Sequence, residues 1–120
     1  MSDLKEKVRI ARHTRIRKRI KSIPERPRLC VHRSLKNLYV QVIDDQKANT
    51  LFAFSTLHKE IKVKSSYGGN LNAAKNLGEV LAGKLKEKGI NQIVFDKGGY
   101  LFHGRIKTFA EALKKGGIVF

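Results

Sequence analysis

Residues 28–43 read RLCVHRSLKNLYVQVI and decide the fold, because two short alternating segments flank a turn. In residues 28–33, apolar Leu and Val alternate with Cys and His, which is the pattern of a half-buried strand. Residues 38–43 alternate in the same way, and residues 34–37 between them contain the turn formers Ser and Asn. The stretch therefore predicts an antiparallel hairpin with one apolar face.

The sequence that follows continues this sheet and then changes period. Residues 57–69 show no regular pattern and are expected to form a loop. A helix between two strands favours a right-handed crossover, so the last strand is expected to be parallel to its neighbour. The elements expected after the hairpin are a third strand at 50–56, a helix from Asn70 or Asn72 to about Lys88, a strand at 90–96, a glycine-rich loop at 97–104 and a last helix ended by Gly116 and Gly117. The expected fold class is α/β, with a small mixed sheet that joins a three-strand antiparallel meander to a parallel fourth strand, and with flanking helices.

Basic residues dominate the chain and concentrate at its start. The 120 residues include 26 Lys and Arg but only 10 Asp and Glu, a net charge of +16. Residues 1–28 carry eleven basic and three acidic side chains, so half of the excess lies in under a quarter of the length. We expect residues 1–25 to form a basic arm, partly helical or disordered when free, and residues 26–120 to form one globular domain.

The arm has a thin apolar stripe, Ile16, Ile20 and Ile23, and prolines at 24 and 27. The prolines predict that its helix ends there and that residues 23–28 form an extended linker. Three interpretations of the arm remain open: a solvated basic tail, a membrane-surface or calmodulin-target helix, and a nucleic-acid-binding arm. Nucleic-acid binding is favoured, since guanidinium groups bind phosphate in a bidentate manner.

Several functional classes are disfavoured by composition. The longest apolar runs are too short for a transmembrane helix, the one cysteine excludes an internal disulfide framework, and residues 1–7 predict no secretory signal. We therefore expect a cytoplasmic protein. The four histidines and Cys30 show no metal-ligand spacing, and the glycine-rich loop lacks a P-loop pattern, so neither a metal nor another cofactor is expected.

Carboxylates are too few for an obvious catalytic centre. Asp44 and Asp45 share a turn, whereas Asp96 ends a strand and is expected to accept backbone N–H groups of the glycine-rich loop. We expect the turn pair to lie at a different corner from Asp96. Cys30 is expected to be a small core residue.

The remaining signal is recognition of RNA, because aromatic and amide groups beside cations suit unpaired nucleotides. For Tyr39 and Tyr100 a core ring with a solvated hydroxyl is an equal alternative, and for Arg105 the alternative is an exposed residue at a helix start. The candidate RNA-binding residues are Arg9, Arg12, His13, Arg15, Arg17, Lys18, Arg19, Lys21, Arg26, Arg28, His32, Arg33, Ser34, Asn37, Tyr39, Gln41, Lys97, Gly98, Gly99, Tyr100, His103, Gly104, Arg105 and Lys107.

Four motifs, in order and at matching spacing, carry a family resemblance. They are RPRLCVHRS at 26–34, NLYVQVIDD at 37–45, VFDKGGYLFHGR at 94–105 and GGIVF at 116–120. Together they resemble bacterial-type large-subunit ribosomal protein eighteen over nearly the whole chain, although the arm is similar only in character. The resemblance implies a ribonuclease H-like topology and a non-enzymatic role in the large subunit.

The partners that the resemblance implies are 5S ribosomal RNA, 23S ribosomal RNA and neighbouring ribosomal proteins. We further expect no membrane partner and a monomer when the protein is free. The resemblance also implies that the protein helps to attach 5S ribosomal RNA at the central protuberance. Family members commonly have Arg and Tyr where this chain has Lys97 and Phe102. Lys97 keeps the charge without bidentate geometry, and Phe102 keeps a ring without a hydroxyl.

Two rival classes remain open. A nuclease with a ribonuclease H type of fold needs several converging carboxylates to hold Mg²⁺, and only Asp44, Asp45 and Asp96 are candidates. A basic DNA-architectural protein would share the charge but bind duplex DNA as well as RNA.

Overall fold

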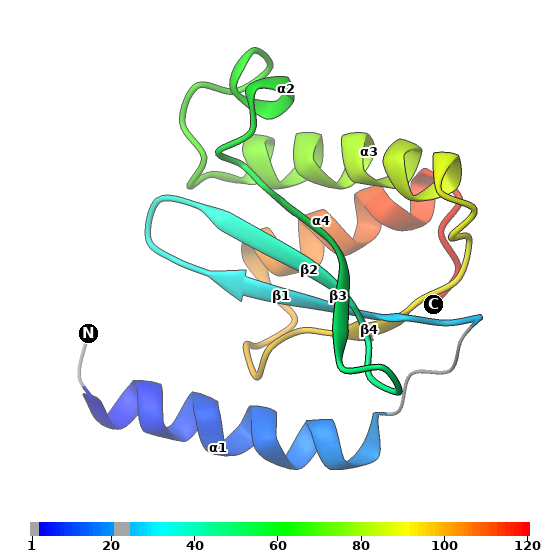
Figure 1. Cartoon of the computed structure of the whole chain (residues 1–120). Coiled ribbons are helices and arrows are strands. Elements are labelled where there is room, and N and C mark those ends of the chain that lie inside the picture. Colours follow the sequence, from blue (N-terminus) through cyan, green and yellow to red (C-terminus); the bar gives the residue numbers. More distant parts are fainter. Residues whose placement is uncertain (1–2, 21–24) are drawn as a thin grey trace.

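A computed structural model describes residues 3–20 and 25–120 (Figure 1). The elements, in chain order, are α1 (Asp3–Arg19), β1 (Arg28–Arg33), β2 (Leu38–Asp44), β3 (Asn49–Ser55), α2 (Lys59–Lys62), α3 (Leu71–Glu87), β4 (Val94–Asp96) and α4 (Gly104–Lys115). The strand order in the sheet is β3-β2-β1-β4. β1 pairs antiparallel with β2 and parallel with β4, while β2 pairs antiparallel with β3. The predicted mixed sheet is confirmed.

The two faces of the sheet differ as the alternation predicts. Leu29 and Val31 of β1 are buried together with Val40 of β2. The intervening positions pair across the hairpin on the opposite face, Cys30 with Gln41 and His32 with Tyr39. Cys30 and Tyr39 are half-buried, whereas His32 and Gln41 are exposed.

The buried face is covered by α3 and α4, which lie side by side (Figure 1). Their apolar stripes bury Leu77, Leu81 and Leu85 from α3 and Ile106, Phe109 and Leu113 from α4. The start of α3 and the end of α4 lie where the sequence predicts. Asn70 caps α3, since its side chain accepts the N–H of Ala73 at 2.8 Å, and Gly116 caps the C-terminus of α4.

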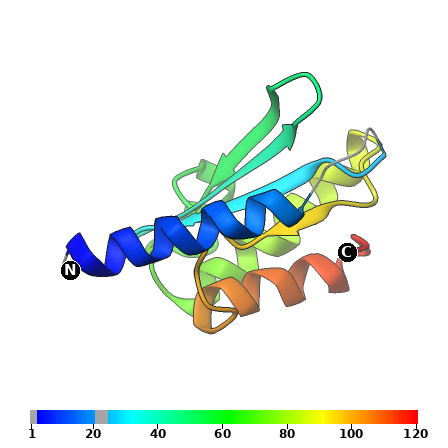
Figure 2. The ribbon, with the colours of Figure 1, turned by 90° about the horizontal axis from the view of Figure 1, so that it is seen from below.

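The opposite face of the sheet is crossed by α1, as the view in Figure 2 shows. This helix confirms helical structure in the described part of the basic segment, yet none of its residues is buried. The predicted end of the helix at Pro24 and most of the predicted linker lie outside the described residues. Pro27 is buried directly before β1. The division into an arm and a body stays a prediction.

Two expectations for the body need correction. The last strand is shorter than residues 90–96, because Ile90 donates its N–H to Leu85 O and Ile93 donates to Val119 O, so these residues close α3 and pair with the C-terminal segment. The region 57–69, expected to be loose, also contains the short helix α2. Its buried Ile61 packs into the core and fixes it there.

Candidate nucleic-acid interface

The basic helix α1 is attached to the body through polar contacts with the glycine-rich loop and β4. Nη1 of Arg9 donates to Gly98 O at 2.7 Å, and Nη1 of Arg12 donates to Gly99 O at 2.8 Å. Nε2 of His13 donates to Oδ2 of Asp96 at 2.8 Å. One stripe of α1 therefore faces the body; its polar groups make these contacts, and Ile16 on the same stripe is half-buried.

Gly98 and Gly99 permit this close approach. Both have positive φ angles, +69° and +80°, which side-chain-bearing residues rarely adopt. A Cβ atom at Gly99 would lie 2.5 Å from Arg9 O and 2.9 Å from the Cβ of His13. The backbone that approaches Gly99 is thus that of α1, whereas a Cβ atom at Gly98 would meet the Val31 carbonyl oxygen of β1.

Asp96 is the hub of the attachment. Its carboxylate is fully buried and accepts from Nη1 of Arg28 at 2.7 Å, from His13, and from the N–H of Gly98 at 2.9 Å. The expectation that Asp96 accepts loop N–H groups is confirmed. Burial alone raises the pKa of the Asp96 carboxyl, but the hydrogen bonds from His13, Gly98 and Arg28 outweigh it and lower that pKa.

Arg28 also binds Asp45, with its Nε 3.0 Å from Oδ2. The expectation that the turn carboxylates lie at a different corner from Asp96 is therefore wrong for Asp45, since one guanidinium bridges the two acids. Burial lowers the pKa of Arg28, yet the bonds to Asp45 and Asp96 raise it overall. In sequence Arg28 resembles the cations of the preceding arm, so this role was missed.

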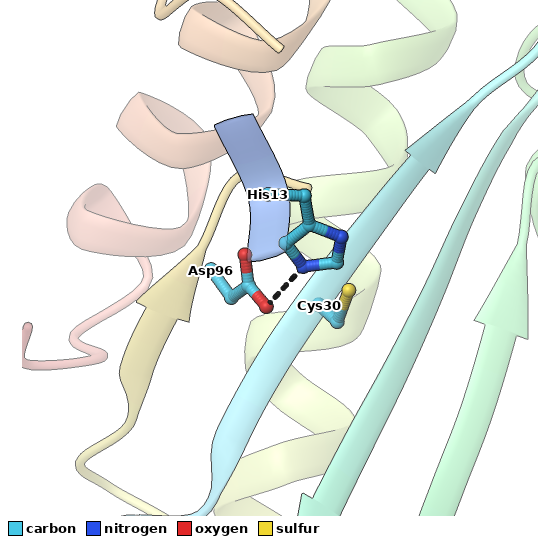
Figure 3. Close-up of side chains that lie close together, drawn as sticks. All are labelled: His13, Cys30 and Asp96. Carbon is cyan, nitrogen blue, oxygen red and sulfur yellow. Dashed lines mark hydrogen bonds and ion pairs between the residues drawn. The ribbon is translucent and has the colours of Figure 1, made fainter. Parts of the chain in front are cut away.

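His13, Cys30 and Asp96 converge beneath α1, with their ligand-type atoms within 4.8 Å of one another (Figure 3). Within residues 3–20 and 25–120 this is the one such His, Cys and carboxylate group. Linear spacing could not reveal it, since three separate elements supply its members. Two features disfavour a metal ion: Arg28 already donates to the same Asp96 oxygen as His13, and burial raises the pKa of the Cys30 thiol to about 11.

The other side of α1 presents cations to solvent. Arg15, Lys18 and Arg19 are exposed, and so is Arg17, which lies 3.7 Å from Asp45. The candidate Lys21 lies outside the described residues. The helix thus separates its cations into Arg9 and Arg12, which contact the loop, Arg17, which pairs with Asp45, and Arg15, Lys18 and Arg19, which are exposed to an incoming anion.

Beside α1, an aromatic cluster occupies the exposed face of the sheet. The His32 and Tyr39 rings lie 5.9 Å apart, and the Tyr100 hydroxyl donates to Arg33 O at 3.2 Å. The Tyr100 ring is 7% exposed and lies beneath the guanidinium groups of Arg9 and Arg33. Tyr100 is therefore a core ring, whereas His32 and Tyr39 border solvent together with Gln41.

Arg105 joins the start of α4 to the first hairpin loop. Its Nη2 donates to Ser34 O at 2.7 Å and its Nη1 to Asn37 O at 3.4 Å. The interpretation of Arg105 as an exposed helix-start residue is wrong, because the side chain is half-buried and engaged. Burial, followed by the charge of Arg33, lowers the pKa of Arg105.

The last candidates surround this end of the molecule or flank the arm. His103 and Lys107 are exposed, while Lys97 and Gly104 are half-buried. Arg26 is exposed and donates from Nε to Oε1 of Gln92 at 2.9 Å.

Comparison with known proteins shows which family this basic α/β chain belongs to. A family model described as ribosomal L18 of archaea, bacteria, mitochondria and chloroplasts matches residues 3–120. The chain belongs to the ribosomal L18 family. Large ribosomal subunit protein uL18 of Koribacter versatilis is 56% identical over 110 residues, which cover 90% of this chain and 89% of that protein.

Further members agree. The uL18 protein of Ruminiclostridium cellulolyticum is 49% identical over 116 residues, covering 97% of this chain and 95% of the relative. The uL18c protein of Spinacia oleracea is 52% identical over 114 residues, which cover 93% of this chain and 69% of that protein. Membership of the L18 family confirms the resemblance. The protein is therefore a structural component of the large ribosomal subunit, which lies in the cytoplasm. No described helix has the length and apolarity needed to cross a membrane.

Proposed function

We propose that this protein binds 5S ribosomal RNA and helps to attach it to 23S ribosomal RNA at the central protuberance of the large subunit. The observation that carries the proposal is the exposed cationic side of α1 beside the open sheet face with His32, Tyr39 and Gln41. Phosphate pairing, ring stacking and amide hydrogen bonds are the three interactions that folded RNA with unpaired bases requires. Both surfaces lie on the side of the sheet that α3 and α4 leave open.

The charge of the whole chain supports a polyanionic partner. A net charge of +16 creates self-repulsion that a bound polyanion relieves. In this proposal Arg15, Lys18 and Arg19 neutralise phosphates, while His32 and Tyr39 contact bases. Exposed His103 and Lys107 extend the same role to the start of α4.

The nuclease alternative is disfavoured by the surroundings of its candidate carboxylates. Asp45 and Asp96 are both neutralised by Arg28, and a guanidinium within 3.0 Å competes with Mg²⁺ for the same oxygens. Incubation of labelled 5S RNA with the protein and Mg²⁺ tests this directly. We expect intact RNA, and magnesium-dependent cleavage would support the nuclease instead.

A gel-shift comparison tests the proposed surface. The variant Arg15→Gln, Lys18→Gln, Arg19→Gln removes three exposed cations of α1. The matched control replaces three exposed lysines near α2, Lys59, Lys62 and Lys64, by Gln. We expect the α1 variant to bind 5S RNA at least tenfold more weakly at physiological salt and to lose about two to three units of salt slope. Equal loss in the control would show that only total charge matters.

A further inference from the structure

The attachment of α1 differs from that of α3 and α4. Those helices bury apolar stripes, whereas no residue of α1 is buried. Its hydrogen bonds with the body come from Arg9, Arg12 and His13, which donate to two carbonyl oxygens and one carboxylate, and Arg17 also lies 3.7 Å from Asp45. Because each such bond exchanges for one to water, the docked helix is only weakly held.

The acceptor side of this contact is preformed. The carboxylate of Asp96 is fixed by Arg28 from β1 and by the N–H of Gly98, neither of which belongs to α1. The body therefore offers a rigid group of acceptors, Asp96 Oδ2 with the Gly98 and Gly99 carbonyls, inside a strongly basic protein. This group selects one orientation of α1, the one that places His13 over Asp96 (Figure 3).

We propose that Asp96 is a positioning residue for RNA binding: by holding His13 it orients α1, so that Arg15, Lys18 and Arg19 face the RNA beside the open sheet. This inference rests on the proposed function. RNA that contacts both the exposed side of α1 and the sheet binds the docked helix best. By linkage, RNA stabilises the docked helix to the same degree that docking strengthens RNA binding.

Cys30 supplies a built-in reporter of docking. It is the single cysteine of the chain, it is half-buried, and its sulfur lies within 4.8 Å of the His13 and Asp96 ligand atoms. Lifting α1 exposes this thiol, so its alkylation by N-ethylmaleimide measures how often α1 leaves the body. This measurement does not depend on the identity of any RNA.

His13→Ala is the variant that weakens docking, since alanine favours the helix and removes the bond to Asp96, together with the ring that lies near the Cys30 sulfur. Thr14→Ala is the matched control, because the Thr14 hydroxyl donates to Ile10 O within α1 itself. We expect His13→Ala to speed alkylation of Cys30 about three- to tenfold, and Thr14→Ala to change it less than twofold. An unchanged rate in His13→Ala, both free and with saturating 5S RNA, overturns the proposal.

A double-mutant cycle links docking to RNA affinity in the full chain. His13→Ala, Asp96→Asn and the double variant are compared in 5S RNA binding, with circular dichroism as a check of folding. If Asp96 acts through His13, the double variant binds within twofold of Asp96→Asn alone. If the two losses multiply, Asp96 serves only the stability of the body and the proposal fails.

The outcomes separate the two hypotheses. If Asp96→Asn does not fold, the His13→Ala variant alone decides the question. Faster alkylation of Cys30 together with at least threefold weaker RNA binding supports the proposal. Either change without the other contradicts it. Should the wild-type protein not bind 5S RNA, the proposed function fails, and the positioning role for RNA fails with it. The alkylation rates then still show whether His13 holds α1 on the body.

Discussion

Arg28 and Asp96 form a buried ion pair across the parallel strands β1 and β4, with Nη1 and Oδ2 2.7 Å apart and side chains 4% and 0% exposed. The same guanidinium reaches Asp45 after β2, and the same carboxylate reaches His13 of α1. The pair therefore connects the sheet, a turn and the basic helix. A charge pair this deeply buried becomes costly when either partner is removed.

Replacing Arg28 by Met leaves the Asp96 carboxylate buried without its cation. We expect the free energy of unfolding to fall by about 3–5 kcal/mol, measured by urea denaturation. Glu79→Gln is the control, because Glu79 forms an exposed pair with Lys75 at 4.0 Å, and it should cost less than about 0.5 kcal/mol. Similar losses in both variants would contradict the structural role of the buried pair.

The lowered pKa of Asp96 predicts a defined loss of stability in acid. A carboxyl whose pKa is lower in the folded than in the unfolded protein stabilises the fold fully above its unfolded value, about 4, and loses that contribution as pH falls through the folded value. Wild-type and Asp96→Asn proteins should thus differ most in unfolding free energy above about pH 5 and converge below about pH 4. Urea unfolding from pH 7 to pH 3 measures this, and a constant difference would refute it.

Two helical glycines in α3 should respond oppositely to alanine. A Cβ at Gly78 would lie 2.6 Å from the Ala112 Cβ and 2.7 Å from Phe109 O, where α3 meets α4. Gly78→Ala should therefore destabilise the protein by about 1–3 kcal/mol despite the better helix propensity of alanine. Gly83 has no neighbour within 4 Å of the same position, so Gly83→Ala should stabilise by about 0.5–1 kcal/mol. Thermal unfolding of both variants is the measurement.

The Cys30 thiol should be a poor nucleophile in the folded protein. Burial, followed by the negative charge of Asp96, raises its pKa to about 11. The rate of alkylation by iodoacetamide should consequently keep rising with pH up to at least about pH 10, whereas in urea it should level off near the ordinary thiol value of about 8.5. A plateau at the ordinary value in the folded protein would contradict this environment.

The sequence was sufficient for the fold wherever apolar residues repeat with a regular period. Alternation in residues 28–43 indicated the hairpin and its two faces, and the change of period after the third strand indicated α3. The start of β4 was predicted less well, because residues 91–93 pair with the C-terminal segment, a contact that no local pattern encodes. Short α2 lacks a periodic stripe and was missed for the same reason.

The candidate interface was predicted in its composition but not in its internal contacts. Basic side chains of the arm and of the first strand were expected to face RNA uniformly, yet Arg9 and Arg28 bind groups of the protein itself. Charge alone does not distinguish such residues from exposed Arg15 or Lys18. The distinction arises from tertiary structure, which brings α1, β1 and β4 together at Asp96.

The most direct test of the central claim is binding of 5S ribosomal RNA and of duplex DNA across a salt series, from about 50 to 300 mM. With about six phosphates neutralised, the affinity for 5S RNA should fall with a log–log slope near −4 to −5, and at physiological salt the protein should bind 5S RNA far more tightly than the duplex. Equal affinity for duplex DNA, or no binding of 5S RNA, would contradict the account.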